Sequence, residues 1–339
     1  MIRVSFHEGR APRALFPLAL LLIAALAAPA WAGDGAVTAF RDKSYDVRFV
    51  TASEAWIVGY PGMVLHSVDA GATWSRVDVG TADALFAVDF VDERTGWIVG
   101  RSGTILRTTD GGKTWARQKA DTTEPLFAVD FLNATVGCAV GNFGTVFWTG
   151  DGGATWEKRQ VEPMVNASLN AVAVLGPETA LVGGDYPSWE LDLTANLDPE
   201  SISNLYRTDD GGKTWSVVKT GSKAILYDVA FEPDETRGFA AGTKGTLLST
   251  ADGGRTWSEI QTGETNHLTG LALAPDGPWA VGLDGVIVKS ASGAARKASS
   301  GIYGWLSSIA FSGGDGKIGI AVGSRGVILR TTDGGRTWK

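Results

Sequence analysis

The sequence predicts an all-β protein, a seven-bladed β-propeller with four antiparallel strands in each blade. An octapeptide of the form Ser/Thr-x-Asp-x-Gly-x-Thr-Trp occurs six times, with its closing tryptophans 41, 41, 59, 42 and 81 residues apart. Three short apolar segments precede it in each repeat. A period in the forties with several short strands per unit is typical of propellers.

The chain begins with a segment that we exclude from this fold. Three arginines precede an apolar run from Ala14 to about Ala28, and Ala30-Trp31-Ala32 has the small-x-small pattern that signal peptidase reads. Residues 1–32 are therefore predicted to be a signal peptide, and the protein is expected to be exported to the periplasm. An uncleaved anchor is the alternative, although the apolar run is shorter than the roughly 20 residues of a bilayer span.

The composition limits the possible partners and chemistry. The 339 residues are 44% hydrophobic and 20% charged, with 45 glycines and 13 tryptophans, which suits a large core and many tight turns. Removal of the signal peptide, with its three arginines and one glutamate, takes away a charge of +2 and changes the formal net charge from −7 to −9. An acidic protein is a poor partner for nucleic acid. Cys138 is the only cysteine, and its apolar neighbours predict a small buried side chain rather than a reactive thiol.

The repeats contain the same pieces in the same order. In the second unit an apolar run, Leu85 to Phe90, is followed by "GWIVG", by "GTILRT" and by the octapeptide. With the run after the tryptophan, "WARQK", this makes four strands. The sixth unit lacks the octapeptide but keeps "LTGLAL", "PWAVG" and "GVIVKS", so the longest interval holds two units and the total is seven.

The seventh unit ends at Trp338 and Lys339 and so lacks an outermost strand. A further strand, Ala36 to Arg41, precedes the first unit, and we expect Val37 to Phe40 to complete the seventh blade. This N-terminal strand would close the ring and leave no inner sheet edge exposed. The propeller is thus predicted to span residues 33–339.

The octapeptide resembles the Asp-box, or bacterial neuraminidase repeat. Its glycine can adopt a positive φ, its aspartate can accept hydrogen bonds from the turn, and its tryptophan can pack between sheets. We interpret these residues as structural, because six equivalent carboxylates spread around a ring cannot converge on one substrate or one metal ion. The aspartate and tryptophan pairs are Asp69 and Trp74, Asp110 and Trp115, Asp151 and Trp156, Asp210 and Trp215, Asp252 and Trp257, and Asp333 and Trp338.

Sialidases carry the same repeat, so a glycan-active protein, either a sialidase-like glycoside hydrolase or a lectin, is the alternative function. Sialidases also need an arginine cluster, a tyrosine nucleophile with a glutamate, and an acidic proton donor. The chain resembles them only in the repeat, and seven blades replace their six. No catalytic residue is assigned. Because His7, His66 and His267 are the only histidines, neither a histidine-based metal site nor a triad is expected, and no cofactor is predicted.

The connections between the second and third strands are expected to share one face of the ring with the links between units. Their flanking glycines recur while the residues between them differ, which is a usual construction of a binding face. The fourth unit carries an insertion there, residues 185–202, and long insertions are often functional. Ordinary solvated turn residues are the alternative interpretation of these connections, and structural cover over the channel mouth is the alternative for the insertion. The predicted partner-binding residues are Tyr60, Arg101, Phe143, Tyr186, Trp189, Lys244, Tyr303, Trp305 and Arg325.

The chain after the signal peptide, with "GWIVG", "GTILRTTDGGKTW" and "GVILRTTDGGRTW", resembles the photosystem II stability and assembly factor family. That family consists of exported, seven-bladed, non-enzymatic propellers of cyanobacteria and chloroplasts, with relatives in bacteria that do not photosynthesise. The resemblance implies a scaffold that holds a newly made membrane protein, or a peptide segment of one, through an arginine patch on one face. It implies the thylakoid lumen as location in a photosynthetic host, and contact with the membrane only through the client. We expect a monomer.

Overall fold

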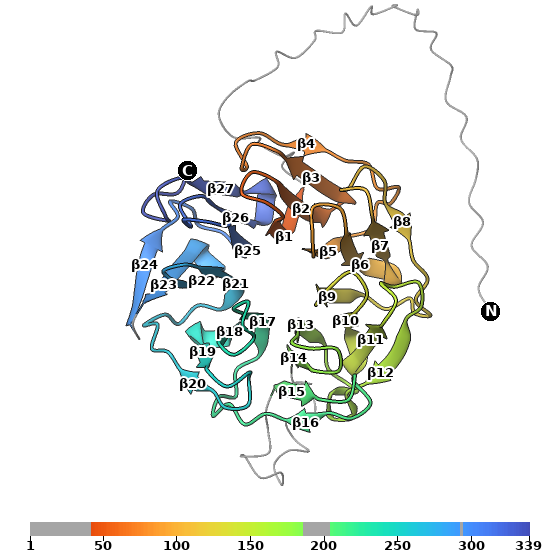
Figure 1. The fold of residues 1–339 in the computed structure, drawn as a ribbon. Coiled ribbons are helices and arrows are strands. Elements are labelled where there is room, and N and C mark those ends of the chain that lie inside the picture. The colour runs from red at the N-terminus through yellow and green to blue at the C-terminus, as the bar shows by residue number, and fades with distance from the viewer. Residues whose placement is uncertain (1–41, 186–203, 292–293) are drawn as a thin grey trace, which may run out of the picture. The chain divides into compact units, whose positions relative to one another are not determined.

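The computed structural model describes residues 42–185, 204–291 and 294–339, which belong to one compact unit running from Asp34 to Lys339. Seven antiparallel sheets stand radially around a common axis, and the first strand of each sheet is its innermost (Figure 1). Within the described residues six sheets have four strands and the last has three. The predicted all-β class and seven-bladed propeller are confirmed.

The first four blades occupy residues 43–217. Their innermost strands lie closest to the axis of the ring, and their fourth strands lie at the rim (Figure 1). The first blade comprises β1 (Lys43–Phe49), β2 (Ala55–Tyr60), β3 (Met63–Ser67) and β4 (Ser75–Arg76). The second comprises β5 (Leu85–Phe90), β6 (Gly96–Gly100), β7 (Ile105–Thr108) and β8 (Ala116–Arg117). The third comprises β9 (Leu126–Phe131), β10 (Gly137–Gly141), β11 (Thr145–Thr149) and β12 (Glu157–Gln160). The fourth comprises β13 (Leu169–Val174), β14 (Ala180–Gly184), β15 (Leu205–Thr208) and β16 (Ser216–Val217).

The remaining blades repeat this plan. The fifth comprises β17 (Leu226–Phe231), β18 (Gly238–Gly242), β19 (Leu247–Thr250) and β20 (Ser258–Glu259). The sixth comprises β21 (Leu268–Ala274), β22 (Gly277–Gly282), β23 (Val286–Ala291) and β24 (Ala294–Ser299). The seventh comprises β25 (Leu306–Phe311), β26 (Gly319–Gly323) and β27 (Ile328–Thr331). Short 3-10 turns connect some of these strands, namely η1 (Arg101–Gly103), η2 (Asn142–Gly144), η3 (Glu162–Met164), η7 (Thr243–Gly245), η8 (Leu283–Gly285) and η9 (Ser324–Gly326).

The hydrophobic core lies between blades rather than within them. The buried side chains form one cluster at each seam between neighbouring blades, including the seam between the seventh and the first. This follows from the sequence pattern, because the second strands, such as "GWIVG", are buried along their whole length and fill both seams beside them. Each buried Val, Leu, Ile or Phe contributes about 1.5 to 3 kcal/mol.

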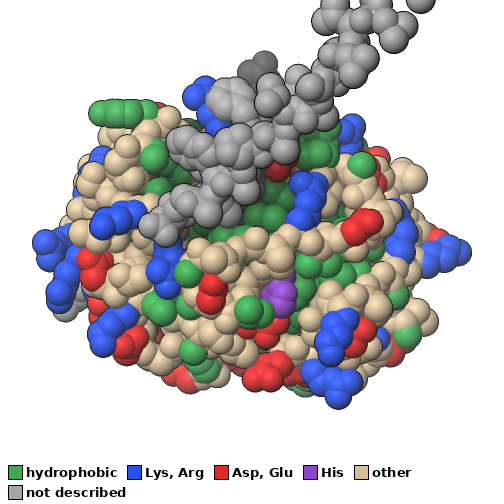
Figure 2. All heavy atoms as spheres, turned by 90° about the horizontal axis from the view of Figure 1, so that it is seen from above, with side chains coloured by type: hydrophobic (Ala, Val, Ile, Leu, Met, Phe, Trp, Pro, Cys, Tyr) green, Lys and Arg blue, Asp and Glu red, His purple; other side chains and the backbone are tan. Residues whose placement is uncertain are grey.

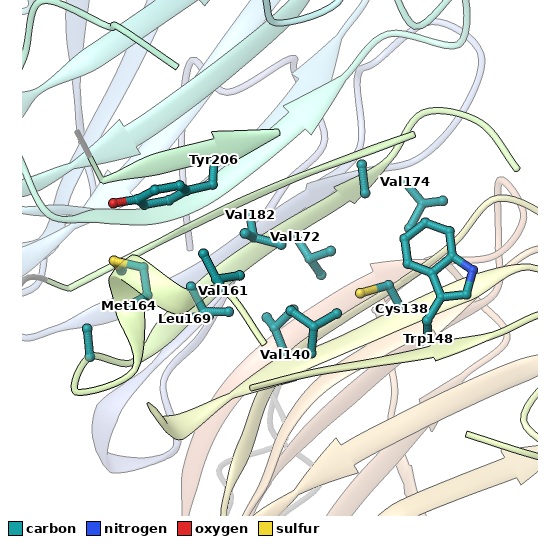
Figure 3. Packing of buried hydrophobic residues seen from close by; sticks show 13 residues of the cluster. Cys138, Val140, Trp148, Val161, Met164, Leu169, Val172, Val174, Val182 and Tyr206 are labelled. Carbon is teal, nitrogen blue, oxygen red and sulfur yellow. The ribbon is translucent and has the colours of Figure 1, made fainter. Parts of the chain in front are cut away.

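Cys138 illustrates this packing. Figure 3 shows its sulfur between the third and fourth blades, near Val140, Trp148 and Val172. The side chain is fully buried, and burial raises the pKa of the thiol far above its usual value. The prediction that Cys138 is a buried apolar side chain is therefore confirmed.

The ring is closed by contacts between the first and seventh blades. Ser308 Oγ donates to Asp46 Oδ1 at 2.7 Å, Ser307 Oγ donates to the carbonyl of Ser44 at 2.7 Å, and Arg330 Nε donates to the carbonyl of Ala70 at 2.8 Å. These pairs are about 260 residues apart in sequence. The described residues alone thus join the two ends of the propeller.

Several predicted features lie outside the described residues. They are the signal peptide, residues 1–32, the closing strand, Val37 to Phe40, and most of the insertion, residues 186–202. At the other end of the chain, Lys339 exchanges two backbone hydrogen bonds with Arg330, so it lies where a fourth strand of the last sheet would begin. No helix found in the described part of the chain is long and apolar enough to cross a membrane.

Candidate binding face and central channel

The two faces of the ring differ in the connections that they carry. The turns between second and third strands contact the links between blades: the N–H of Arg101 bonds the carbonyl of Ala84, and the N–H of Gly103 bonds that of Glu124. We call this side the link face. On the opposite side, the box face, the octapeptide turns contact the connections between first and second strands, as Gly111 N–H does with Arg94 O.

The turns of the link face share an unusual backbone conformation. Five of them place a residue other than glycine in the left-handed region, with φ between 55° and 61°. Those residues are Ser102, Phe143, Lys244, Asp284 and Arg325. Their side chains are exposed, and the conformation costs of order 1 kcal/mol or more for a residue with a Cβ. In each turn the following glycine also has a positive φ, which is the two-residue hairpin conformation that joins antiparallel strands, so the turn fixes where each exposed side chain stands.

The structure places the described members of the predicted binding set on the link face. Phe143, Lys244 and Arg325 occupy the left-handed turn position, whereas Arg101 and Tyr60 come one position earlier in their turns. Phe143 is 51% exposed and Tyr60 43% exposed. Tyr186 and Trp189 lie outside the described residues.

Tyr303 and Trp305 lie between two turns. The carbonyl of Gly304 accepts the N–H of Gly285 in η8, and the carbonyl of Trp305 accepts the N–H of Ser324 in η9. The side chain of Tyr303 is 98% exposed and that of Trp305 is 46% exposed. This backbone hydrogen bond joins Trp305 to the turn that carries Arg325, which lies 20 residues later in the sequence.

The three predicted cations are not brought together. Arg101, Lys244 and Arg325 stand on the second, fifth and seventh blades, and no hydrogen bond or ion pair joins them within the described residues. Figure 2 shows Lys and Arg side chains interspersed with Asp and Glu over the surface in view. The basic positions are thus spread around the ring rather than gathered in one patch.

Two further arginines brace the turns, and we did not predict them. Arg76 Nη2 donates to the carbonyl of Pro61 at 3.0 Å, and Arg117 Nη2 donates to that of Ser102 at 3.3 Å. Each arginine is the second residue after an octapeptide tryptophan, and this recurrence in the sequence could have identified both of them.

The channel mouth at the link face carries an aromatic arc, which we define as Tyr45, Phe86 and Phe127. They lie on the innermost strands of three successive blades. Phe86 and Phe127 are the second residues of β5 and β9, and Tyr45 is the third residue of β1. Their ring centroids are 5.2 and 5.3 Å apart, each pair tilted by 54°. Each lies at a register irregularity of its strand, and such bulges re-aim a side chain.

Below the arc the innermost strands carry four carboxylates, which we call the acidic ring: Asp46 and Asp228 directly follow the register irregularity of their strands, and Asp89 and Asp130 lie two residues further along theirs. One oxygen of each accepts a backbone N–H of the next innermost strand in the ring. The bonds run from Val88 to Asp46 at 2.9 Å, from Phe131 to Asp89 at 2.9 Å, from Val174 to Asp130 at 2.6 Å and from Leu271 to Asp228 at 2.7 Å. The aspartates of "LFAVDF" and "LYDVAF" were the sequence signal, which we did not interpret.

Arg48 is the cation that faces this ring. Its Nη2 lies 3.0 Å from Asp89 Oδ1, and half of its side chain is exposed although it belongs to an innermost strand. Burial raises the pKa of Asp228 to about 7. Burial and the neighbouring Asp89 carboxylate raise that of Asp130 to about 7 as well. Four carboxylates thus share one guanidinium.

The octapeptide aspartates are fully engaged by their own turns. Asp110 Oδ1 accepts Thr108 Oγ1 at 2.8 Å and the Thr114 N–H at 3.0 Å, and Oδ2 accepts Thr114 Oγ1 at 2.7 Å. The other five turns repeat this pattern. Bonds from the threonine four residues later lower the pKa of Asp110 to about 2. These carboxylates act within the turns, as a structural role requires.

The octapeptide tryptophans pack at the seams. Trp115 meets Trp56 of the preceding blade edge-on at 5.9 Å between ring centroids, and it meets Phe90 at the same distance. Two of the cavities that the described residues form, of about 260 and 480 Å³, lie on this box face, and both are lined by apolar as well as charged and polar side chains. No three His, Cys, Asp or Glu side chains within residues 42–185, 204–291 and 294–339 are grouped so that they could hold a metal ion.

Comparison with known proteins extends this description. A family model described as "Photosynthesis system II assembly factor YCF48" matches residues 36–82, 77–127 and 208–300, which together make up more than half of the chain. A search of curated proteins finds no match.

Several solved structures share the fold. A structure described as "YCF48 bound to D1 peptide" is 19% identical, with a TM-score of 0.65 over 88% of this chain and 93% of that one. YCF48 from Cyanidioschyzon merolae is also 19% identical, with a TM-score of 0.65 over 86% and 96%. A GH74 xyloglucanase from Xanthomonas campestris is 14% identical, with a TM-score of 0.68 over 88% of this chain and 53% of that one. At these identities the likeness concerns the fold alone.

Proposed function

The chain belongs to the photosynthesis system II assembly factor YCF48 family, and we propose that it is a non-catalytic scaffold whose link face binds a segment of a membrane protein. Family membership is the observation that carries this proposal. The structure described as "YCF48 bound to D1 peptide" supports it, because a propeller of the same fold there holds a peptide.

The link face suits such a partner. Exposed aromatic side chains and arginines are the residues that contribute most to protein interfaces, and here they stand on rigid turns at several points of a ring. A peptide lying across this face would meet Tyr60, Phe143, Trp305 and Arg325 without any deep cleft. The strained turn positions are already ordered, so binding them costs little additional entropy.

The proposal includes the location of the protein. Residues 1–32 would direct export and be removed, which places the propeller in the periplasm or, in a photosynthetic host, in the thylakoid lumen. N-terminal sequencing of protein recovered from that compartment tests this part, and a mature protein that retains residues 1–32 would contradict it. A monomer is proposed, and light scattering of the purified protein tests it.

Capture of partners from detergent-solubilised host membranes tests the binding face. The tagged protein is compared with a variant that carries Arg101→Glu, Lys244→Glu and Arg325→Glu. A matched control carries Lys113→Glu, Lys213→Glu and Arg336→Glu, three exposed cations of the box face. We expect a membrane protein to be retained by the wild-type protein and the control and lost by the link-face variant. Equal retention by all three would remove the link face from the proposal.

A glycan-active protein is the second candidate, favoured by the exposure of Tyr303 and Trp305, since aromatic platforms also bind sugars. The GH74 enzymes show that this fold can carry glycoside chemistry. Glycan-array binding that Trp305→Ala abolishes, or hydrolysis of a glycoside lost with one link-face carboxylate, would favour this candidate over the scaffold.

A further inference from the structure

One position of the repeat changes its chemistry around the ring. Each innermost strand has one residue at its register irregularity that is skipped in the pairing with the second strand, and we call this the bulge position. In the first three blades it is filled by the aromatic arc. The other four blades carry Asn170, Tyr227, Thr269 and Ser307 there. All seven side chains are partly exposed, so they line the mouth of the channel.

In three of the other four blades the bulge position is held by hydrogen bonds of the fold. Thr269 Oγ1 donates to a carbonyl of the seventh blade at 2.6 Å, and Ser307 Oγ donates to a carbonyl of the first blade at 2.7 Å. Asn170 Nδ2 donates to Asp185 Oδ1 at 2.7 Å. Small polar side chains therefore meet the structural needs of this position.

The aromatic arc has no comparable role in joining blades by hydrogen bonds. Its three rings contact one another, with centroids 5.2 and 5.3 Å apart, and the Tyr45 hydroxyl has no hydrogen-bond partner among the residues that the structure describes. Three successive aromatic side chains are thus more than the fold requires at this position. Contiguous apolar side chains that remain partly exposed are typical of interaction sites.

The bulge position lies beside the turns of the link face. The bond between Asn170 and Asp185 shows this, because Asp185 has the same place in its blade as Arg101 has in the second blade. The N–H of each bonds the carbonyl two residues before the bulge position. By the same repeat, Arg101 stands beside Phe86, and the arc therefore faces a partner that lies on the link face.

The three turns beside the arc carry a single charge among them. Arg101 is exposed and forms no ion pair within the described residues. Two carboxylates of the adjoining links, Asp83 and Glu124, accept hydrogen bonds from side chains of the protein itself. Arg101 is therefore available to a carboxylate of a partner, and a guanidinium holds a carboxylate through charge-assisted hydrogen bonds. The three turns are residues 60–62, 101–103 and 142–144.

We propose that the aromatic arc receives a bulky apolar side chain of the bound membrane-protein segment, while a neighbouring carboxylate of that segment pairs with Arg101. Aromatic rings give an apolar side chain a large and rigid contact area, and such anchors contribute most of the binding energy of an interface. The charge pair fixes the register of the segment. A sugar fits less well, since rings tilted by 54° to one another offer it no common plane. This inference rests on the proposed function, because it names the side chains of that same partner.

Short peptides test the arc by itself. The probe is the acetylated and amidated tripeptide Asp-Leu-Asp, with Asp-Ser-Asp and Lys-Leu-Lys as comparators, titrated into the uniformly 15N-labelled protein. The backbone amide signals of Phe86, Arg101 and Phe127 report on the arc, and that of Tyr227 reports on another part of the mouth. We expect saturable shifts at the arc with Asp-Leu-Asp and about tenfold weaker binding of each comparator. Equal binding of either comparator, or no saturable shift with Asp-Leu-Asp, would overturn the proposal.

A double variant removes the arc and keeps residue types that the repeat tolerates. Phe86→Ser with Phe127→Asn places at the bulge position the residue types that the seventh and fourth blades carry there, as Ser307 and Asn170. It should bind Asp-Leu-Asp at least about tenfold more weakly. Tyr227→Ala changes an aromatic side chain at the same position of the fifth blade and is the matched control, which should leave binding unchanged. Unchanged affinity in the double variant, or an equal loss in the control, would contradict the proposal.

Arg101→Gln tests the charge pair and leaves the rings in place. It should weaken binding of Asp-Leu-Asp about three- to tenfold and leave binding of the neutral peptide Ser-Leu-Ser unchanged. Lys213→Gln, at an exposed cation of the box face, controls for net charge and should alter neither affinity. Equal effects of Arg101→Gln on the two peptides would show that no carboxylate pairs with this side chain, and the proposal would fail.

The outcome is separable from that of the capture experiment. If no membrane protein is captured but Asp-Leu-Asp binds the arc, the scaffold function fails and the site on the arc stands. If a membrane protein is captured equally by the wild-type protein and by the double variant, the scaffold function stands and the inference about the arc fails. Arc signals that shift with protein concentration in the absence of peptide would identify a second copy of this chain as the occupant, which would also overturn the inference.

Discussion

The carboxylate of Asp89 accepts the backbone N–H of Phe131 at 2.9 Å, so a side chain of one innermost strand bonds the main chain of the next. Innermost strands pair with a neighbour on only one edge, and the N–H groups of the other edge need partners. Asp46, Asp130 and Asp228 serve the same purpose at three other seams. These carboxylates therefore hold neighbouring blades together.

Replacing Asp89 tests this bond. Asp89→Ala removes the acceptor of the Phe131 N–H and leaves Arg48 without its ion-pair partner, and we expect a loss of about 3 kcal/mol in the free energy of unfolding. Asp89→Asn retains an acceptor and should cost less. Urea denaturation measures both, and equal losses in the two variants would show that the hydrogen bond to Phe131 does not matter.

The channel carboxylates predict how stability depends on pH. The pKa of Asp130 and of Asp228 is raised to about 7 from an ordinary value near 3.8, so the folded state binds these protons more tightly than the unfolded state. Their contribution to stability is fully present below about pH 4 and is lost as the pH rises to about 7. The surrounding charges are Asp46, Asp89 and Arg48.

The octapeptide aspartates act in the opposite direction. The pKa of Asp69 is lowered to about 2, and so is that of Asp151, so their contribution is present above about pH 4 and is lost as the pH falls toward 2. We expect the urea midpoint to be highest near pH 4 to 5 and to fall toward pH 7. Asp130→Asn with Asp228→Asn should flatten the fall, and a midpoint that rises from pH 5 to 7 in the wild-type protein would contradict this assignment.

The second glycine of the octapeptide is required by both its conformation and its surroundings. Gly112 has a φ of +75°, and a Cβ there would lie 2.2 Å from the ring of Trp56. We expect Gly112→Ala to cost about 3 kcal/mol or more. Gly221 has a φ of +72° but nothing within 4 Å, so Gly221→Ala should cost only about 1 kcal/mol. Similar unfolding midpoints for the two variants would mean that the contact with Trp56 is unimportant.

Two tryptophans with opposite surroundings should respond differently to alanine. Trp97 is fully buried, stacks on Phe131 with ring centroids 3.4 Å apart, and donates Nε1 to the carbonyl of Gly152 at 3.1 Å. Trp97→Ala should cost about 3 to 5 kcal/mol. Trp305→Ala should change thermal stability little but reduce membrane-protein capture, and a large loss of stability there would argue that this ring serves the fold instead.

The arrangement of pieces within a repeat was predictable because it is local. The octapeptide specifies a turn through bonds between residues at most four positions apart, such as Thr114 Oγ1 to Asp110. The spacing between successive octapeptides then gives the number of blades. The link-face turns were also located correctly, since each is bounded by glycines that a Cβ would obstruct, as Gly100 is by the carbonyl of Ala84 at 2.2 Å.

The channel could not be recognised in the same way. Asp89 in "LFAVDF" looks like any polar residue at the end of a strand, and its partner Phe131 lies 42 residues away. The spread of Arg101, Lys244 and Arg325 over different blades was likewise invisible, because sequence alone does not show how far around a ring each turn stands.

The amino-acid sequence by itself determined the class of fold, the number of blades and the conformation of their turns, because these depend on short-range hydrogen bonds and on apolar periodicity. Only the tertiary structure decided that Asp46, Asp89, Asp130, Asp228 and Arg48 share one channel below the aromatic arc. The physical reason is closure of the ring. Radial stacking turns the unpaired edges of the innermost strands toward one axis. There, carboxylates far apart in sequence accept the free N–H groups of the neighbouring strand and come close enough to interact electrostatically.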